Sequence, residues 1–319
     1  MEKTVPAASE LLKDQPKNWN RWGPEDEVGG LNFLTRQEVL RGVRAVTQGK
    51  VFTLQIQMGH PDGDPVWPGR KESQRANVVD EGLYLAGKGP QFPGGLHYAD
   101  DVMFLYLQGS TQYDALGHVW CDGKLYNGYD AKTTMGGMSK ASVLPLAERG
   151  IVGRGVLIDM ARHRGKAVLD PGETFNHEDL LAAAAAQGVT IEKHDVLVVR
   201  TGWIGSFHHR DRTEFYRNFV EPGLTYSPAL VEWFHAMEIP NLATDTIANE
   251  VTVDPISGVV LPLHVALMSN LGVTFTEICS LDALAADCAE DSQWSFLYAA
   301  APLKVVGGSG APVNPIAVK

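Results

Sequence analysis

Short apolar runs that alternate with helical segments are the feature that most limits the fold of this chain. Buried strands are expected over 153–160, 195–203 and 241–246, because each run is apolar and is bounded by polar residues or glycine. An alanine-rich helix is expected over 180–187 and an amphipathic helix over 227–237. Strands that alternate with helices in this way indicate an α/β protein.

The length and composition are those of a globular protein with a sizeable core. The 319 residues contain 44% hydrophobic and 20% charged side chains, which excludes a disordered or fibrous chain. No internal repeat and no composition break marks a linker, so a single domain over residues 1–319 is the simplest interpretation. The net charge of −11 argues against nucleic acid or an anionic membrane as the main partner.

Targeting signals are not visible in the sequence. The first 19 residues mix charges with few apolar side chains, so they do not resemble a secretory signal. No run approaches the length of about 18 apolar residues that a membrane span needs. Three cysteines are too few for a disulfide framework. We therefore expect a cytoplasmic protein that does not enter a membrane.

One polar segment, residues 108–118, carries the side chains that most favour chemistry. It follows the apolar run 102–107, which is predicted to be a buried strand. A chain that leaves a strand through glycine and serine can present several polar side chains to one small volume. Four of them have spacings typical of a metal-binding or acid–base cluster: Gln108, Gln112, Asp114 and His118.

Two later residues could complete a metal site. His264 opens a predicted helix, and Glu277 lies on the strand that is expected to follow it. The pair alone is a weak motif, but with Asp114 it makes an Asp/His/Glu set that suits Zn²⁺ or Mn²⁺ with open positions. Asp245 ends an apolar strand, where it could orient His264 or simply serve as a cap or turn residue.

The segment 60–101 is long and rich in glycine, proline and charge. Connections of about 40 residues without periodicity are uncommon inside compact proteins, and many of them are functional loops or lids. A poorly ordered surface insertion is the other interpretation, and the sequence favours neither.

The chain resembles the cyclase family of metal-dependent hydrolases, to which kynurenine formamidases and isatin hydrolases belong. The family motif reads His-x-Gly-Thr-His-x-Asp-x-Pro-x-His, and Thr111, Asp114 and His118 match it. Gln108 and Gln112 stand where the motif has its first two histidines. The resemblance extends over most of the chain.

The family's later histidine, its Gly-Val or Gly-Ile pair and its glutamate correspond here to His264, Gly272-Val273 and Glu277. In members with two metals, one ion is held by the first two motif histidines and the aspartate. The other ion is held by the aspartate, the later histidine and the glutamate. The resemblance thus implies one divalent ion in this chain, Zn or Mn, with Asp114, His264 and Glu277 as its ligands.

The resemblance also implies roles for the other motif residues. His118 becomes the candidate general base, because neutral imidazole can take a proton near pH 7. Gln108, Thr111 and Gln112 are expected to position substrate or water. The expected fold is the swivelling β/β/α type, and the expected assembly is a homodimer or homotetramer.

The leading hypothesis is a metal-dependent hydrolase of a small cyclic or aromatic amide or lactone. An arylformamidase similar to kynurenine formamidase is the nearest alternative, although loss of two motif histidines weighs against it. The other alternative is a ligand-binding relative that kept the pocket and lost the metal. Retention of all four of Asp114, His118, His264 and Glu277 argues against that alternative.

Overall fold

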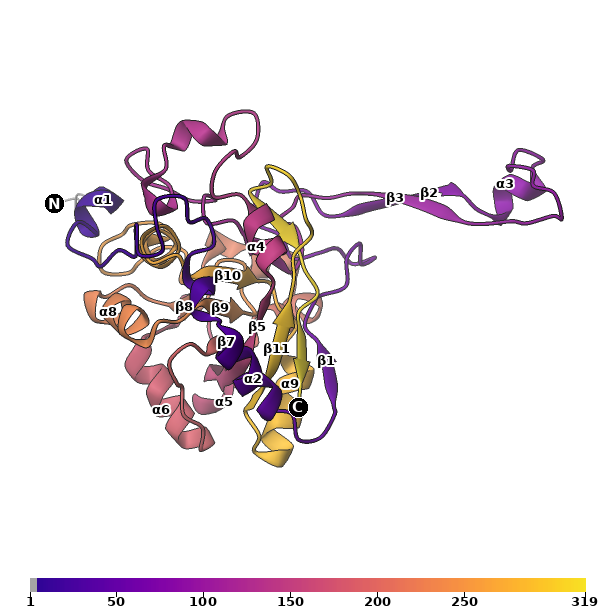
Figure 1. The fold of residues 1–319 in the computed structure, drawn as a ribbon. Coiled ribbons are helices and arrows are strands. Elements are labelled where there is room, and N and C mark those ends of the chain that lie inside the picture. Colours follow the sequence, from indigo (N-terminus) through magenta and orange to yellow (C-terminus); the bar gives the residue numbers. More distant parts are fainter. Residues whose placement is uncertain (1–4) are drawn as a thin grey trace.

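The computed structural model describes residues 5–319 and shows a mixed α/β protein built on one nine-stranded sheet, which curls into a half-barrel (Figure 1). In spatial order its strands are β1 (Val51–Thr53), β13 (Ile316–Val318), β11 (Ser295–Ala300), β5 (Ile151–Asp159), β7 (Val196–Arg200), β9 (Asn241–Thr244), β10 (Thr274–Glu277), β4 (Gln112–Asp114) and β12 (Gly310–Pro312).

The centre of the sheet is parallel and buried. Strands β5, β7, β9 and β10 pair in parallel, whereas the flanking strands are antiparallel. Every residue of β9 and β10 is buried, as is normal for parallel strands covered on both faces. The three predicted core strands are confirmed by β5, β7 and β9.

The two helices predicted before and after β7 are present as α6 and α8, among the helices of the described chain. They are α1 (Ala8–Leu11), α2 (Arg36–Arg44), α3 (Glu81–Leu85), α4 (Val143–Arg149), α5 (Met160–His163), α6 (His177–Gln187), α7 (Arg212–Phe215), α8 (Pro228–Met237) and α9 (Asp282–Asp291). Asn176 and Asp179 form a capping box at the start of α6, and Gly188 ends it in the left-handed conformation. The Ser227 hydroxyl accepts from the Leu230 amide to cap α8.

Shorter segments complete the chain. The 3₁₀ turns are η1 (Gly29–Phe33), η2 (Tyr126–Gly128), η3 (Ala131–Thr134), η4 (Ile204–His209) and η5 (Arg217–Phe219), and η6 (His264–Asn270) is a π-helix. Two small sheets pair β6 (Thr174–Phe175) with β8 (Gly223–Leu224), and β2 (Gln74–Val79) with β3 (Asp100–Phe104). Across residues 5–319, no helix combines the length and apolar character that crossing a membrane requires.

A buried polar network joins the strands that carry the candidate site. The Tyr113 hydroxyl on β4 lies 2.9 Å from Asn241 Oδ1 and 3.0 Å from the Tyr298 hydroxyl. The Asn241 amide donates to the Thr274 carbonyl at 2.7 Å. Because each group has a partner, the network can hold β4, β9, β10 and β11 in one arrangement inside the core.

Strands β2 and β3 form an arm, residues 74–104, that extends away from the body with α3 near its tip (Figure 1). The prediction of a buried strand over 102–107 is wrong: the strand ends at Phe104, whose side chain is 75% exposed. The physical reason is that β3 pairs with β2 alone and no layer of the body covers it. Within the segment 60–101, regular structure is confined to β2, α3 and the start of β3.

Gly272 connects η6 to β10 at a point where two backbones nearly touch. Its φ of +73° is in the left-handed region, and a Cβ built there would lie 2.8 Å from the Gly29 Cα and 2.7 Å from the Tyr126 ring. The Gly30 amide donates to the Gly272 carbonyl at 2.7 Å. Only glycine fits both the conformation and the space.

Gly272→Ala is expected to lower the free energy of unfolding by about 3 kcal/mol, because backbone strain adds to overpacking. Gly136→Ala is the matched control, since its φ is +76° and nothing lies within 4 Å of the added Cβ. Its expected loss is about 1 kcal/mol, from the backbone term alone. Urea denaturation of both variants checks this, and equal losses would contradict the role of the close approach.

Candidate metal centre

Three predicted ligands meet although up to 163 residues separate them in sequence. Asp114 ends β4, Glu277 ends β10 and His264 begins η6. One donor atom of each lies within 4.8 Å of the others, and the three residues are 1–3% exposed. The antiparallel pairing of β4 with β10, in which Gln112 is opposite Glu277, brings the two carboxylates to the same face of the sheet.

Unpartnered oxygen atoms fill this centre. Both carboxylate oxygens of Asp114, Oε1 of Glu277 and Oε1 of Gln112 are buried, and each lacks a hydrogen-bond donor within the described part of the chain. A buried oxygen without a partner costs roughly 1–3 kcal/mol, and more if it is charged. A cation held by Asp114, His264 and Glu277 would satisfy the carboxylate oxygens, so the residues present fit a divalent metal ion. Carboxylate oxygens with one imidazole suit Zn²⁺ or Mn²⁺.

The pKa of Glu277 also shows that negative charge is crowded in this centre. Burial first, and then the neighbouring charge of Asp114, raise the pKa of Glu277 to about 7. The neighbouring imidazole of His264 acts in the opposite direction. Two carboxylates that oppose each other's ionisation in a buried site are typical of a functional centre, and a bound cation would let both ionise.

Glu250 orients His264, and the sequence did not predict it. Its Oε1 lies 2.6 Å from Nδ1 of His264 and accepts the backbone amide of His264 at 2.7 Å. Nε2 of the same ring is then left facing Glu277 Oε1 at 3.4 Å. Burial opposes the charged imidazole, but the neighbouring carboxylates of Glu250 and Glu277 outweigh it and raise the pKa of His264 to about 10. A carboxylate behind a histidine is the usual support of a metal ligand.

Asp245 does not orient His264, so this part of the prediction is wrong. Its carboxylate accepts the Thr201 amide at 2.6 Å, the Thr201 hydroxyl at 2.8 Å and the Gly202 amide at 2.7 Å. It holds the turn that follows β7, as the alternative interpretation expected. No local pattern distinguishes Glu250 from Asp245, because both lie in one loop and only the path of that loop decides which one meets His264.

Gln112 stands inside the centre. Its Nε2 donates to Glu277 Oε2 at 2.7 Å, so the amide uses the second oxygen of that carboxylate. Gln108 lies further out, where its Nε2 donates to the Ser309 hydroxyl at 3.0 Å. Thr111 is fully buried, and its hydroxyl donates to the Ile278 carbonyl and accepts the Ile56 amide. These bonds position all three residues beside the centre, and their contacts with substrate stay a prediction.

His118 is more accessible to solvent than Asp114, His264 and Glu277. Its Nε2 lies 4.0 Å from Asp114 Oδ1, beyond hydrogen-bond distance, and its side chain is 22% exposed. Burial is the largest cause that lowers the pKa of His118, and the charge of His264 lowers it further, against the opposite effect of Asp114. A neutral imidazole at the open side of the centre can accept a proton.

Arg70 is a cation at the same centre that sequence reasoning missed. Its Nη1 donates to the Gln108 carbonyl at 2.9 Å. Its charge acts in the direction of a lower pKa for both His118 and Glu277. No motif marks this arginine, since it comes from the segment before the arm.

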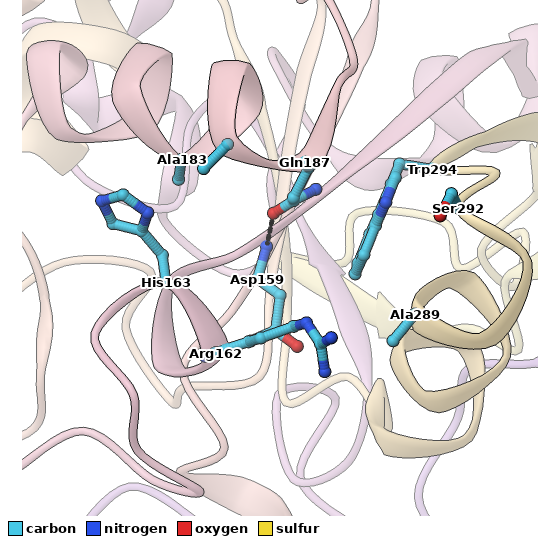
Figure 2. A pocket seen from close by; sticks show the side chains of 9 residues that line it. Asp159, Arg162, His163, Ala183, Gln187, Ala289, Ser292 and Trp294 are labelled. Atoms are coloured by element: carbon cyan, nitrogen blue, oxygen red, sulfur yellow. Dashed lines mark hydrogen bonds between the residues drawn. The ribbon is translucent and has the colours of Figure 1, made fainter.

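Two other features are weaker candidates. His60, Asp62 and His208 also bring donor atoms within 4.8 Å of one another, but Asp62 is 80% exposed and water can satisfy it. Figure 2 shows a surface hollow of about 290 Å³ beside α5 and α6. Its Gln187 amide already binds the backbone of Asp159 and Leu157. The hollow contains none of the predicted site residues.

Comparisons with known proteins establish the family to which the chain belongs. The model of the family described as Putative cyclase matches residues 52–251. A crystal structure described as a novel cyclase is 33% identical, with a TM-score of 0.87 over 99% of this chain and 100% of that one. The chain belongs to this cyclase family. No curated protein sequence matches it.

More distant structures share the fold. Isatin hydrolase A from Labrenzia aggregata is 18% identical, with a TM-score of 0.59 over 87% of this chain and 96% of that chain. A predicted metal-dependent hydrolase from Bacillus stearothermophilus is 16% identical, with a TM-score of 0.53 over 85% of this chain and 98% of that chain.

Glu250→Gln is expected to weaken binding of Zn²⁺ or Mn²⁺ by about 10- to 100-fold, because the amide no longer holds the imidazole as a carboxylate does. Titration of the metal-free protein by calorimetry measures the change. Asp245→Asn is the control: it should lower stability at the turn after β7 and leave metal affinity within about twofold. Equal affinities of the Glu250→Gln variant and the unmodified protein would remove Glu250 from the centre.

Proposed function

We propose that this protein is a metal-dependent hydrolase that cleaves an amide or lactone bond of a small cyclic or aromatic substrate. The four unpartnered buried oxygens around His264 carry the proposal. The distant likeness to isatin hydrolases and to predicted metal-dependent hydrolases supports the class of reaction. We also propose the swivelling β/β/α type as the finer description of the fold.

Asp114, His264 and Glu277 would hold one divalent ion, Zn or Mn. When bound, such an ion lowers the pKa of water and polarises a carbonyl group. Glu250 fixes the imidazole of His264 through Nδ1, so that Nε2 faces the two carboxylates. The surrounding burial keeps bulk water away and strengthens each electrostatic interaction.

His118 would move the proton. In its neutral form, the imidazole takes a proton from the attacking water and returns it to the leaving nitrogen or oxygen. Its side chain is 22% exposed, so a substrate that enters the centre from solvent can contact it. Burial, and then the charges of His264 and Arg70, favour the neutral form by lowering the pKa of His118.

A single ion, not two, is proposed because of Gln112. Its amide nitrogen donates to Oε2 of Glu277, so the side chain that stands in place of a motif histidine binds a carboxylate. An amide group is also a weaker ligand for Zn²⁺ than the imidazole it replaces in the family motif. Gln108 turns to Ser309, so neither glutamine reproduces the missing pair of histidines.

Protein purified without added metal is expected to contain about one equivalent of Zn or Mn, because three ligands remain. A chelator should remove the ion together with hydrolysis of lactones, cyclic imides or formamides, and either metal should restore it. Elemental analysis and a substrate screen measure both quantities. Absence of metal under every loading condition would favour the non-catalytic alternative.

The double variant Gln108→His/Gln112→His is the matched test of stoichiometry. It restores both imidazoles of the motif and should bind about two equivalents, while Gln108→Ala/Gln112→Ala should stay at about one. Two equivalents in the unmodified protein would contradict the proposed single ion without contradicting hydrolysis.

His118→Ala is expected to reduce kcat by about 10²- to 10⁴-fold, because it removes the general base. Its metal content should match that of the unmodified protein, since the proposed ligands are untouched. Steady-state kinetics and elemental analysis on the same sample check both statements. Loss of the ion would instead make His118 a ligand.

A further inference from the structure

Arg70 is a half-buried arginine whose charge is not paired within the described chain. Across residues 5–319, its guanidinium group makes no ion pair, and its one hydrogen bond runs from Nη1 to the Gln108 carbonyl at 2.9 Å. Arg154 and Arg200 are similarly shielded from water, but each pairs with an aspartate, at 2.6 and 3.1 Å. Because a guanidinium group has five N–H donors, Arg70 can bind a further acceptor.

The loop that carries Arg70, residues 59–73, is fixed to the body of the protein. Asp64 is 1% exposed, and its carboxylate accepts two backbone amides from the start of this loop, at 2.9 and 3.0 Å, and one from its end, at 3.4 Å. The Val66 amide donates to the Tyr216 hydroxyl at 3.0 Å. A cation on a fixed loop binds a ligand with little loss of conformational entropy.

Two contacts place this loop beside the candidate metal centre. Trp67 packs on a buried apolar cluster that includes Ile278, the residue after Glu277. Gln108, whose carbonyl Arg70 binds, begins the polar segment 108–118. Burial has the largest effect on the pKa values of His118 and Glu277, and the charge of Arg70 is a smaller cause that acts to lower both. The cation therefore lies within electrostatic reach of the centre.

A guanidinium group with N–H donors to spare suits a planar anion. Two parallel N–H groups match the two oxygens of a carboxylate, and this charge-assisted pair is among the strongest hydrogen-bonding arrangements in proteins. One arginine balances one negative charge. The neighbouring carboxylates of Asp114 and Glu277 disfavour a more highly charged group such as phosphate. A carboxylate is thus the ligand group that fits Arg70 best.

We propose that Arg70 binds a carboxylate group of the substrate, so that the protein prefers amides or lactones that carry such a group. This inference rests on the proposed function, because it assigns the class of substrate at the same centre. Arg70 acts on a part of the substrate that does not react, and it determines specificity through binding. Its removal should therefore affect acidic compounds and spare neutral ones of the same shape.

Calorimetric binding of 2-aminobenzoate and 2-aminobenzamide to the zinc-loaded protein tests this recognition without any reaction, because the two compounds differ only in the carboxylate. The unmodified protein should bind the carboxylate at least about 10-fold more tightly than the amide. Arg70→Gln should weaken binding of the carboxylate by about 10- to 100-fold and leave that of the amide within about twofold. Arg70→Lys keeps the charge without the planar fork, so it should lose about 3- to 10-fold.

Arg210→Gln is the matched control and should bind both compounds as the unmodified protein does. Arg210 is also half-buried and makes no ion pair within residues 5–319, but its guanidinium group lies over the Trp203 ring. Circular dichroism verifies that each variant is folded, and Arg70→Lys replaces Arg70→Gln if the latter is not. Equal binding of the two compounds by the unmodified protein would overturn the proposal. A preference for the carboxylate that survives in Arg70→Gln would overturn it too, since zinc alone would then bind the anion.

Hydrolysis of 2-formamidobenzoate and 2-formamidobenzamide separates this inference from the proposed reaction. Arg70→Gln should raise KM for the carboxylate substrate by about 10- to 100-fold and leave kcat within about threefold, because the contact is made equally before and in the transition state. An equal loss of kcat on both substrates would contradict carboxylate recognition and assign Arg70 to the transition state. If the unmodified protein hydrolyses neither compound, the reaction on these formamides fails, while the binding measurement still decides the role of Arg70.

Discussion

Negative charge buried around one imidazole is the constraint on which the rest of this structure depends. Asp114, Glu277 and Glu250 surround His264, and every one of these groups is almost fully removed from water. Hydrogen bonds satisfy Glu250, but Asp114 and part of Glu277 have no donor in the described chain. A fold can keep such a centre only if rigid elements hold the groups in place and a cation compensates their charge. The buried strands β4 and β10 supply that rigidity.

The two glutamines alter this centre without dismantling it. The amide nitrogen of Gln112 donates to Glu277, while its carbonyl oxygen is buried without a donor in the described chain. An amide carries no charge, so Gln112 compensates less of the buried negative charge than a metal ion bound by two imidazoles would. The uncompensated charge lies on Asp114, beside His264. Gln108 makes no such bond to the carboxylates: its amide donates to Ser309 in the loop before β12. The family membership explains the fold, whereas these two positions explain how this chain differs within it.

The sequence pattern predicted those strands and helices whose formation depends on residues close together in the chain. The apolar run of β7 and the alanine-rich helix α6 were predictable because strand burial and helix propensity can be read from neighbouring residues. Asp114, His264 and Glu277 were predictable from ligand types and motif spacing, without knowledge of their distances. Glu250 was not, because a loop path selects it over Asp245. The run 102–107 was wrongly predicted to be buried because an apolar run does not reveal whether another layer of the protein covers it.

The pairing of Gln112 with Glu277 has one further consequence. Along β4, side chains alternate, so Gln112 and Asp114 face the centre while Tyr113 faces the core network of Asn241. A slip of one residue between β4 and β10 would drive a carboxylate into the apolar core and a phenol ring into the centre. Misfolded pairing is thus penalised twice, once by hydrophobic burial and once by charge. The side chains of the candidate metal centre therefore also specify the register of the strands that carry them.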